Sequence, residues 1–329
     1  MHGPPNRITP KHHELFRKFP CWEGIVREGF RVNFLGVKTR ADYWLTGEPA
    51  AGGNQKTAYP SFDEEYFEWL DLLHAVTRAK QHFTMLELGA GWGRWLTNAA
   101  FALRESSGLP YTLVGVEAEP THFAWMEEHL RENGVDLDRC RLIQAAVTER
   151  DGEVGFRTGN PASWYGQSIG GSTRVKAVSL ATLLEPLEGV DLITLDVQGA
   201  ELRVMRAGAG PLNEKVKCVH IGTHSEKIEA GLRSLFRRLG WENLHDFPAG
   251  QSASTEWGSI HFEDGVQAWL NPRWLSAEDS TVVNRWRSNR EVAHPLASEP
   301  RQNRLRDWLA PEGSLVRRVH ESLVRRWRG

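Results

Sequence analysis

The sequence predicts an α/β protein built on a doubly wound, mostly parallel sheet of seven strands. Three observations carry this prediction. Strand-like and helix-like segments alternate over residues 83–222, which is typical of a parallel sheet covered by helices on both faces. A glycine-rich turn at 89–93 (Gly-Ala-Gly-Trp-Gly) joins the first strand to a helix. An acidic residue, Glu117, ends the next strand, and ligands of such sheets bind beyond the carboxyl ends of the strands.

The elements follow from apolar periodicity and from capping residues. Strands are expected at 83–88, 111–117, 141–147, 190–196 and 216–221, and two later strands, near 241–247 and 257–270, are expected to form a terminal hairpin. Helices are expected at 94–104, 120–133, 199–207 and from Ser225, as the N-cap, to Gly240. Ser61 and Glu64 have the spacing of a capping box, which predicts an earlier helix from about residue 61. Residues 30–37 and their neighbours predict a strand pair.

Three regions divide the chain in this interpretation. Residues 1–80 form an N-terminal extension of loops and a helix, residues 81–272 form the ligand-binding domain, and residues 273–329 form a charged, helical C-terminal extension. The 329 residues contain 40% hydrophobic and 25% charged side chains, as in ordinary globular proteins. A formal net charge of −2 predicts no nucleic-acid partner for the chain as a whole.

The cysteines and the N-terminus bear on location. Three widely spaced cysteines, Cys21, Cys140 and Cys218, fit reduced thiols and neither a disulfide framework nor a metal cluster. The first residues contain no apolar segment typical of a signal peptide, and no run approaches the length of a membrane span. We therefore expect a cytoplasmic protein.

The glycine turn and two acids suggest the ligand. Glycine lets a ligand approach the bare backbone, because no Cβ blocks it. The nicotinamide fingerprint G-x-G-x-x-G would need glycine at position 94, where Arg94 stands. Glu87, at the end of the first strand, suits a cationic amine such as the amino-acid end of S-adenosylmethionine. Glu117 can accept both hydroxyls of a ribose.

The fourth and fifth strands supply candidate catalytic groups. Asp196 ends the fourth strand, where it would face the transferred group, and Glu201 follows after a glycine turn. Strand alternation makes His220 a wall or core residue, whereas His224 can reach the cleft from a loop. A neutral imidazole at His224 could accept the proton of a substrate hydroxyl, with Asp196 positioning the acceptor or the methyl group. A structural histidine, held by hydrogen bonds, is the alternative interpretation of His224.

Together these residues resemble the FkbM-type family of S-adenosylmethionine-dependent methyltransferases. The matching segments are 86–93, 116–120, 146–152, 178–184 and 191–201, within a resemblance that covers roughly residues 80–270. Its most specific part is Asp-x-x-Gly-Ala-Glu at 196–201, in which Gln198 replaces the usual acid. The resemblance implies a class I, Rossmann-like fold and O-methylation of a hydroxyl on a sugar, glycan or natural product.

The resemblance also implies roles for individual residues. Glu87 would hold the methionine amine, Glu117 would hold the ribose, and Asp196 would also adjoin the cofactor. Gly89, Ala90 and Gly91 would provide the backbone contact, and Ala118 with Gln144–Ala146 would bound the adenine. No metal is expected, because the fifth strand ends in His224 and Ser225 and not in paired oxygens.

Two other functions compete with methyl transfer. One is a nicotinamide-dependent sugar oxidoreductase or epimerase, which Arg94 disfavours. The other is a non-catalytic Rossmann-like module, which intact Glu87, Glu117 and Asp196 disfavour. The expected partner is a small-molecule, sugar or glycan acceptor, and the oligomeric state stays open.

A C-terminal helix over Ser314–Gly329 has one apolar stripe and a face with five arginines. Residues 301–329 contain eight arginines and three acids, so this end of an otherwise acidic chain is basic. Two interpretations stay open for this helix. It contacts the anionic inner face of a membrane, with Trp327 at the headgroups, or it packs on its own domain or on a partner subunit.

Overall fold

The computed structural model describes residues 15–43, 52–162, 166–255 and 258–274. The helix expected over Ser314–Gly329 lies outside the described residues, and its two interpretations stay predictions. Among the helices within these ranges, none is long and apolar enough to cross a membrane.

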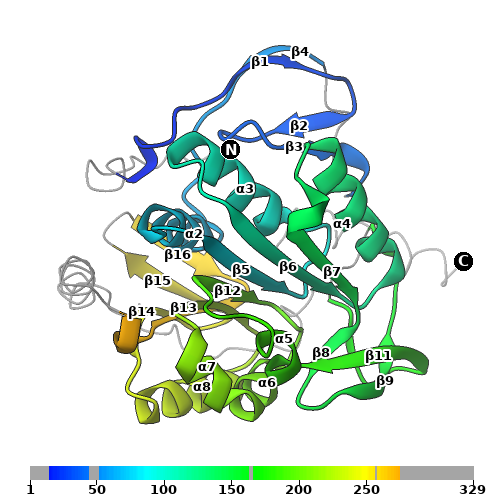
Figure 1. The fold of residues 1–329 in the computed structure, drawn as a ribbon, viewed down its shortest axis with the longest axis vertical. Helices are drawn as coiled ribbons and strands as arrows, with labels where there is room; N and C mark the ends of the chain where they lie inside the picture. Colours follow the sequence, from blue (N-terminus) through cyan, green and yellow to red (C-terminus); the bar gives the residue numbers. More distant parts are fainter. Residues whose placement is uncertain (1–14, 44–51, 163–165, 256–257, 275–329) are drawn as a thin grey trace, which may run out of the picture. The chain divides into compact units, whose positions relative to one another are not determined.

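A seven-stranded sheet forms the centre of the fold (Figure 1). Its strands are β5 (Phe83–Leu88), β6 (Tyr111–Glu117), β7 (Cys140–Gln144), β12 (Leu192–Leu195), β13 (Cys218–Thr223), β14 (Glu242–Phe247) and β17 (Gly265–Leu270). The spatial order is β14-β17-β13-β12-β5-β6-β7. Adjacent strands are parallel, except that β17 is antiparallel to both of its neighbours. The predicted doubly wound, mostly parallel, seven-stranded sheet is therefore confirmed.

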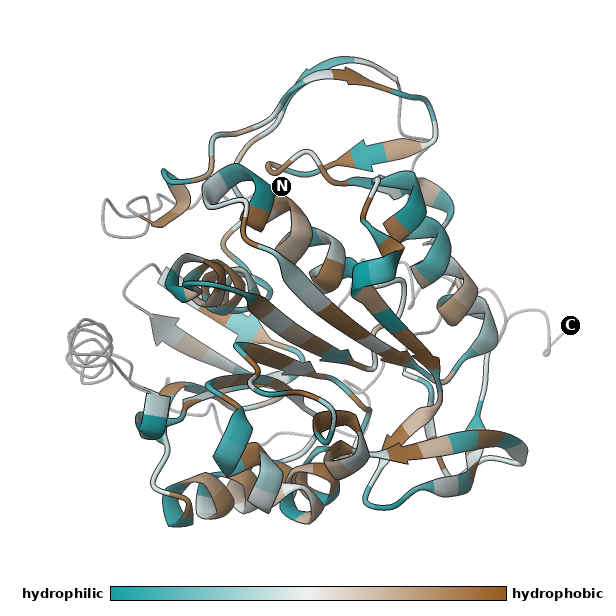
Figure 2. Ribbon diagram, in the orientation of Figure 1, coloured by the Kyte–Doolittle hydropathy of each residue, from teal (hydrophilic) through white to brown (hydrophobic). Residues whose placement is uncertain are grey.

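Helices cover both faces of this sheet, as Figure 1 shows. One face carries α2 (Tyr66–Arg78), α3 (Arg94–Ser106) and α4 (Pro120–Glu132). The other carries α5 (Leu180–Leu184), α6 (Glu201–Ala207), α7 (Ala209–Lys215) and α8 (Glu226–Arg238). All six residues of β5 are buried, and alternate side chains enter the two cores, Met85 on one face and Leu86 on the other. Figure 2 shows the resulting hydrophobic colour along the central strands.

After β7 the chain continues into a second sheet of four strands. It contains β8 (Ala146–Thr148), β9 (Gly152–Arg157), β10 (Ser168–Ile169) and β11 (Thr173–Ser179), in the order β10-β9-β11-β8. The single strand expected at 141–147 is therefore wrong. β7 ends at Gln144, and the backbone N–H of Ala145 donates to the carbonyl of Glu117 where the chain changes sheets.

Smaller elements complete the described chain. They are β1 (Glu23–Val26), β2 (Phe30–Val32), β3 (Lys38–Arg40), β4 (Gly53–Lys56), β15 (Gln251–Thr255), β16 (Gly258–Phe262) and the short helices η1 (Ala41–Tyr43), η2 (Leu137–Arg139) and η3 (Pro272–Trp274). The expected strand pair is confirmed, because β2 pairs with β3. The terminal hairpin needs correction: β14 does pair with β17, but a hairpin of β15 and β16 is inserted between them.

The two capping predictions have opposite outcomes. The Ser225 hydroxyl accepts the N–H of Ile228 and caps α8, as predicted. The capping box at Ser61 is wrong, because α2 begins only at Tyr66 and has no side-chain cap. The Glu64 carboxylate instead accepts the N–H of Glu263, 199 residues away, at 2.8 Å. A tertiary hydrogen bond has replaced the local one.

A buried polar cluster joins α2 to the sheet. Asp71 on α2 bonds to Nδ1 of His220 on β13 at 2.7 Å and to Nε2 of His245 on β14 at 3.1 Å. All three side chains are buried, so His220 is the core residue that alternation predicts. Burial opposes the charge on Asp71, but the charge of His245 and the hydrogen bonds of both histidines lower the pKa of this carboxyl below its usual value.

We predict that Asp71→Ala lowers the free energy of unfolding at pH 7 by about 3–5 kcal/mol, because it leaves two buried imidazoles without their carboxylate. Asp138→Ala, an exposed change on η2, should stay within about 0.5 kcal/mol of the wild type. Because the folded-state pKa of Asp71 is depressed, its contribution is present above the unfolded pKa of about 4 and is lost as the pH falls below it. Urea denaturation at several pH values measures both effects, and equal stability of the two variants at pH 7 would contradict this role.

Candidate functional site

The candidate site lies at the carboxyl ends of β5, β6, β12 and β13, where the glycine turn leaves the sheet. Gly89 has φ = +81°, and a Cβ there would overlap the carbonyl oxygen of Asp196 on the neighbouring strand end. Only glycine satisfies both conditions. Two hollows open around this turn, and both are lined by Gly89, Gly91 and Asp196. Below they are called the apolar pocket and the acidic pocket.

The apolar pocket lies on the β6 side of the turn. Its apolar lining includes Ala118, Ala146, Phe156 and Ile169, the first three of which form a small cluster of their own. Ala118 and Ala146 therefore line one pocket together with Glu117, and their role toward an adenine stays a prediction. Gln144 does not: it ends β7 with an exposed side chain and is absent from this lining.

Glu117 forms the polar end of the apolar pocket. Its two carboxylate oxygens accept the N–H groups of Gly91 and Glu119, each at 2.8 Å. Burial raises the pKa of Glu117 to about 7, although these N–H groups oppose the rise. A carboxylate has about four acceptor positions, so both oxygens can accept a further hydrogen bond from a ligand.

Glu87 lies under the other side of the turn, where it lines the acidic pocket together with Ala90. Its oxygens accept the N–H groups of Trp95 at 3.2 Å and Leu96 at 2.9 Å, in the first turn of α3. Burial raises the pKa of Glu87 to about 8. A group with this pKa gains its charge readily when a cation approaches, which suits the predicted role toward an amine.

The acidic pocket takes its name from six carboxylates in its lining. They are Glu64, Glu65, Glu68, Glu87, Asp196 and Asp264. Arg94 and His220 are the basic residues that line it. Arg94 occupies the position at which the nicotinamide fingerprint has its third glycine. Its guanidinium donates two hydrogen bonds of 2.6 Å to Glu65.

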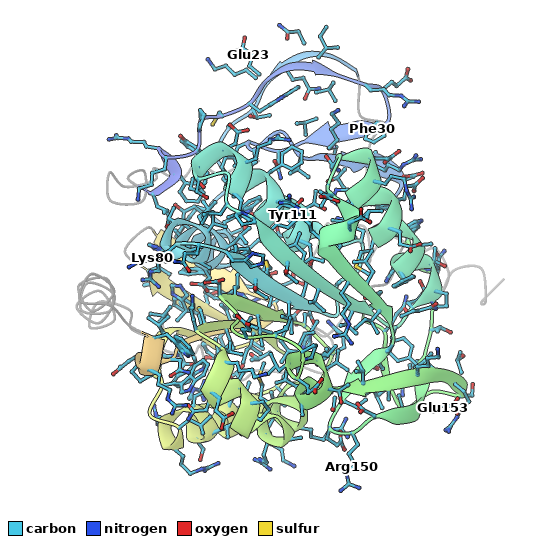
Figure 3. The ribbon with its side chains drawn as sticks, viewed as in Figure 1. Glu23, Phe30, Lys80, Tyr111, Arg150 and Glu153 are labelled. Carbon is cyan, nitrogen blue, oxygen red and sulfur yellow. The ribbon has the colours of Figure 1, made fainter. Side chains whose placement is uncertain are left out.

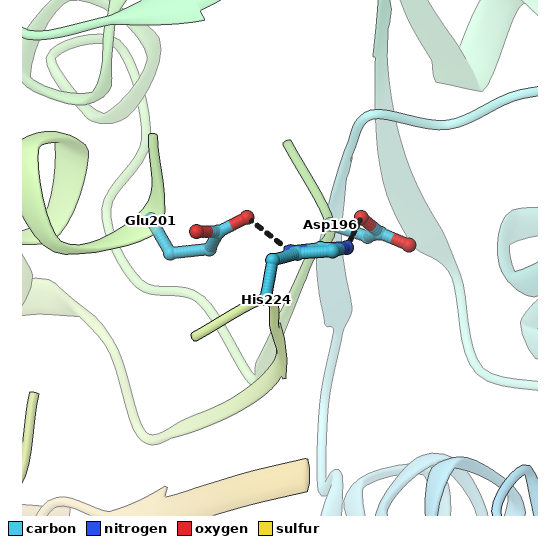
Figure 4. A group of neighbouring side chains, drawn as sticks. All are labelled: Asp196, Glu201 and His224. Atoms are coloured by element: carbon cyan, nitrogen blue, oxygen red, sulfur yellow. Dashed lines mark hydrogen bonds and ion pairs between the residues drawn. The ribbon is translucent and has the colours of Figure 1, made fainter. Parts of the chain in front are cut away.

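Asp196, which lines this pocket, lies next to His224, and His224 lies next to Glu201. Figure 4 shows the three side chains. Nδ1 of His224 lies 2.9 Å from Oε1 of Glu201, which is fully buried at the start of α6. Nε2 of His224 lies 3.4 Å from Asp196 and 3.8 Å from Asp264. Burial opposes the imidazolium, but the hydrogen bond to Glu201 and the charges of Asp196 and Glu201 raise the pKa of His224 to about 9.

Gln198 stands where the motif usually has an acid, and its contacts show what the amide does there. Its side-chain amide donates to Asp196 at 2.8 Å, and its backbone has φ = +51°, an uncommon conformation for a residue other than glycine. An acid in the same orientation would face Asp196 with a like charge. Gln198 therefore orients Asp196 by a hydrogen bond.

Three residues meet the spacing of metal ligands. Within the described ranges, one ligand atom each of Asp196, Glu201 and His224 lies within 4.8 Å of the others. Oε1 of Glu201 is already shared between Nδ1 of His224 and the N–H of Gly199. The expectation of a metal-free site stays a prediction.

Several site residues lie outside the predicted set. Glu201 could have been selected from the sequence, because it belongs to the motif at 196–201. In the structure its carboxylate forms a hydrogen bond with His224. Phe156, Glu68 and Asp264 have no such local signal, because they reach the pockets from other segments. Thr194 lies on β12, two residues before the predicted Asp196.

Comparisons with known proteins agree with this arrangement. Residues 86–240 match the family described as Methyltransferase FkbM domain. A protein of Jannaschia sp. (strain CCS1) named "Putative methyltransferase" is 28% identical over 252 residues, which cover 71% of this chain and 89% of the relative.

Two solved structures are also similar. Methyltransferase FkbM from Methylobacillus flagellatus KT has a TM-score of 0.41 and 12% identity, covering 59% of this chain and 45% of that one. Precorrin-6y C5,15-methyltransferase from Geobacter metallireducens GS-15 has a TM-score of 0.39 and 10% identity, covering 65% and 89%. Because both scores are low, the family assignment rests on the sequence matches, and the fold on the strand order above. Over residues 86–240, the chain is therefore similar to the FkbM family of methyltransferases.

Proposed function

We propose that this methyltransferase uses S-adenosylmethionine and methylates a hydroxyl group on a sugar, glycan or natural product. The observation that carries the proposal is the pair of pockets that share Gly89, Gly91 and Asp196. One pocket combines apolar walls with a carboxylate suited to a ribose, and the other offers carboxylates suited to an amine. A nucleoside and an amino-acid end are the two halves of this cofactor.

The residues fit this cofactor on physical grounds. The backbone at Gly89 is open to a ligand because no Cβ is present, and the walls formed by Ala118, Ala146 and Phe156 suit a flat apolar ring. Glu117 would accept the ribose hydroxyls, and Glu87 the methionine amine. When bound, the cofactor supplies a methyl group that its sulfonium already activates. The protein's contribution is then to position the acceptor and to remove its proton.

His224 is our proposed general base, with Asp196 as the group that positions the acceptor or the methyl group. In neutral His224, the Nδ1–H donates to Glu201, so the lone pair of Nε2 faces the pocket edge near Asp196. With a pKa of about 9, His224 carries a proton at pH 7. A second cation nearby disfavours the imidazolium, so a cationic ligand in the pocket favours the basic form.

We predict that calorimetry detects binding of S-adenosylhomocysteine and of 5′-methylthioadenosine, which lacks the amino-acid end, but not of NAD. Glu117→Ala should weaken both ligands by roughly tenfold to a hundredfold, because hydrogen bonds to a charged acceptor contribute about 1.5–3 kcal/mol. Glu87→Gln should weaken S-adenosylhomocysteine only. Glu23→Gln, on β1, is the control. Unchanged affinity in Glu117→Ala would refute the ribose assignment, and tight NAD binding would refute the cofactor.

We also predict that the affinity for S-adenosylhomocysteine increases as the pH rises from about 6 to about 8. Burial raises the pKa of Glu117 to about 7 and that of Glu87 to about 8, so both carboxyls are largely protonated at the lower pH. An amine that binds to Glu87 favours its ionised form, and binding near pH 7 should therefore release a proton. The dependence of the calorimetric enthalpy on buffer ionisation measures this release. Proton uptake, or none, would contradict the assignment.

A third prediction concerns His224. Its imidazole signals should titrate near pH 9 in NMR, and Glu201→Gln should move the titration to lower pH, because the hydrogen bond to Glu201 favours the charged ring. Glu185→Gln, an exposed change after α5, should leave the titration unchanged. Titration near pH 6.5 in the wild type would contradict the arrangement. If His224→Gln turns over an accepted substrate as fast as the wild type, His224 is not the general base.

A further inference from the structure

The acidic pocket contains more negative charge than its own basic residues neutralise. Arg94 is held by both oxygens of Glu65. His220 is held through Nδ1 by Asp71, and its Nε2 is 3.8 Å from Glu68. Both basic groups are thus engaged by carboxylates. His224, beside the pocket, adds a third cation near Asp196 at 3.4 Å and Asp264 at 3.8 Å, so three basic groups face six carboxylates.

Burial makes this excess costly. It raises the pKa of Glu64 and of Glu68 to about 7 each. Like-charge repulsion adds to this effect: Asp264 raises the pKa of Glu64, and Glu68 raises the pKa of Glu87. A folded protein retains such carboxylates at a cost unless a cation arrives to pair with them. The arrangement therefore points to a cationic ligand.

Thr194 gives independent evidence of a ligand. It lies between Glu87 and His220 in the register of β5, β12 and β13, and it lines the acidic pocket. Its side chain is only 6% exposed, yet its Oγ1 has no hydrogen-bond partner within the described part of the chain. A buried hydroxyl without a partner is costly, so a donor from a ligand would satisfy it.

The proposed cofactor leaves part of this charge unpaired. S-adenosylmethionine carries an ammonium, a sulfonium and a carboxylate, so it adds one net positive charge. Glu87 and Asp196 adjoin the glycine turn, where the cofactor would lie. Glu64 and Asp264 come from separate segments, before α2 and between β16 and β17, and the hydrogen bond from the N–H of Glu263 to Glu64 joins these segments. Both lie outside residues 86–240, which match the family.

We propose that the acidic pocket binds a protonated amine of the methyl acceptor, with Glu64 and Asp264 as its carboxylate partners. The substrate class is then an amine-bearing polyhydroxyl compound, such as an amino sugar. This inference rests on the proposed function, since it assumes that the cofactor occupies the neighbouring part of the site.

The test uses two probes that differ in one group. Glucamine (1-amino-1-deoxyglucitol) and glucitol have the same carbon chain, and glucamine carries an ammonium where glucitol carries a hydroxyl. Each is titrated into full-length protein saturated with S-adenosylhomocysteine, at about 0.15 M salt to screen distant surface charges. Binding is followed by calorimetry and by saturation-transfer NMR. We expect glucamine to bind at least tenfold more tightly than glucitol.

Variants connect this preference to the pocket. Glu64→Gln with Asp264→Asn should reduce the preference to less than threefold. Glu23→Gln removes one negative charge from β1, away from the central sheet (Figure 3), and should keep the full preference. The affinity of each variant for S-adenosylhomocysteine verifies that it is folded.

The two proposals fail in different ways. If the wild type does not bind S-adenosylhomocysteine, the proposed function fails. If it binds S-adenosylhomocysteine but shows no binding of glucamine, or equal binding of the two probes, the amine inference is overturned. A preference for glucamine that survives in the Glu64→Gln, Asp264→Asn protein also overturns it, because other residues would then bind the ammonium group.

Discussion

The close approach of Gly89 to the end of β12 is the constraint on which the site depends. The N–H of Asp196 donates to the carbonyl of Leu88 at 2.9 Å, so the two strands stay paired up to the point where the turn begins. The turn then passes directly over the carbonyl of Asp196, which leaves no room for a Cβ at position 89. With the backbone held there, a hollow opens on each side, toward β6 and toward β13.

The two hollows differ in chemistry because different segments wall them. On the β6 side, the departure of the chain from β7 into the second sheet brings Ala146 and Phe156 opposite Ala118. On the β13 side, α2 and the turn between β16 and β17 contribute carboxylates. The sheet order thus creates one apolar space with a single acid and one space dominated by negative charge. A ligand with a flat apolar end and a cationic end suits this pair.

The acidic side also shows how function and stability are linked in this protein. Glu68 and Asp71 are three residues apart and lie on the same face of α2, where His220 contacts both. The cluster around Asp71 is paired with two histidines and anchors α2 to the sheet, whereas Glu64 and Glu87, which line the pocket, accept hydrogen bonds from backbone N–H groups and from no basic side chain of the described residues. Groups that would stabilise the fold if paired internally are instead available for binding, a cost that is typical of functional sites. Since α2 and Asp264 lie outside residues 86–240, segments outside the matched residues supply part of the lining of the acidic pocket.

The sequence by itself determined the elements with strong local signals. The bounds of β5 and β6 agree with the prediction to the residue, because apolar runs bounded by glycine and acid leave little alternative, and the cap at Ser225 needs only its own helix. Glu87, Gly89, Glu117 and Asp196 could be placed at one edge because parallel strands bring their carboxyl ends together. Tertiary structure alone decided where α2 begins, where β7 gives way to β8, and which side chains meet. The bonds of Glu64 to Glu263, of Glu201 to His224 and of Asp71 to two histidines join segments far apart in the chain, and no local pattern records such contacts.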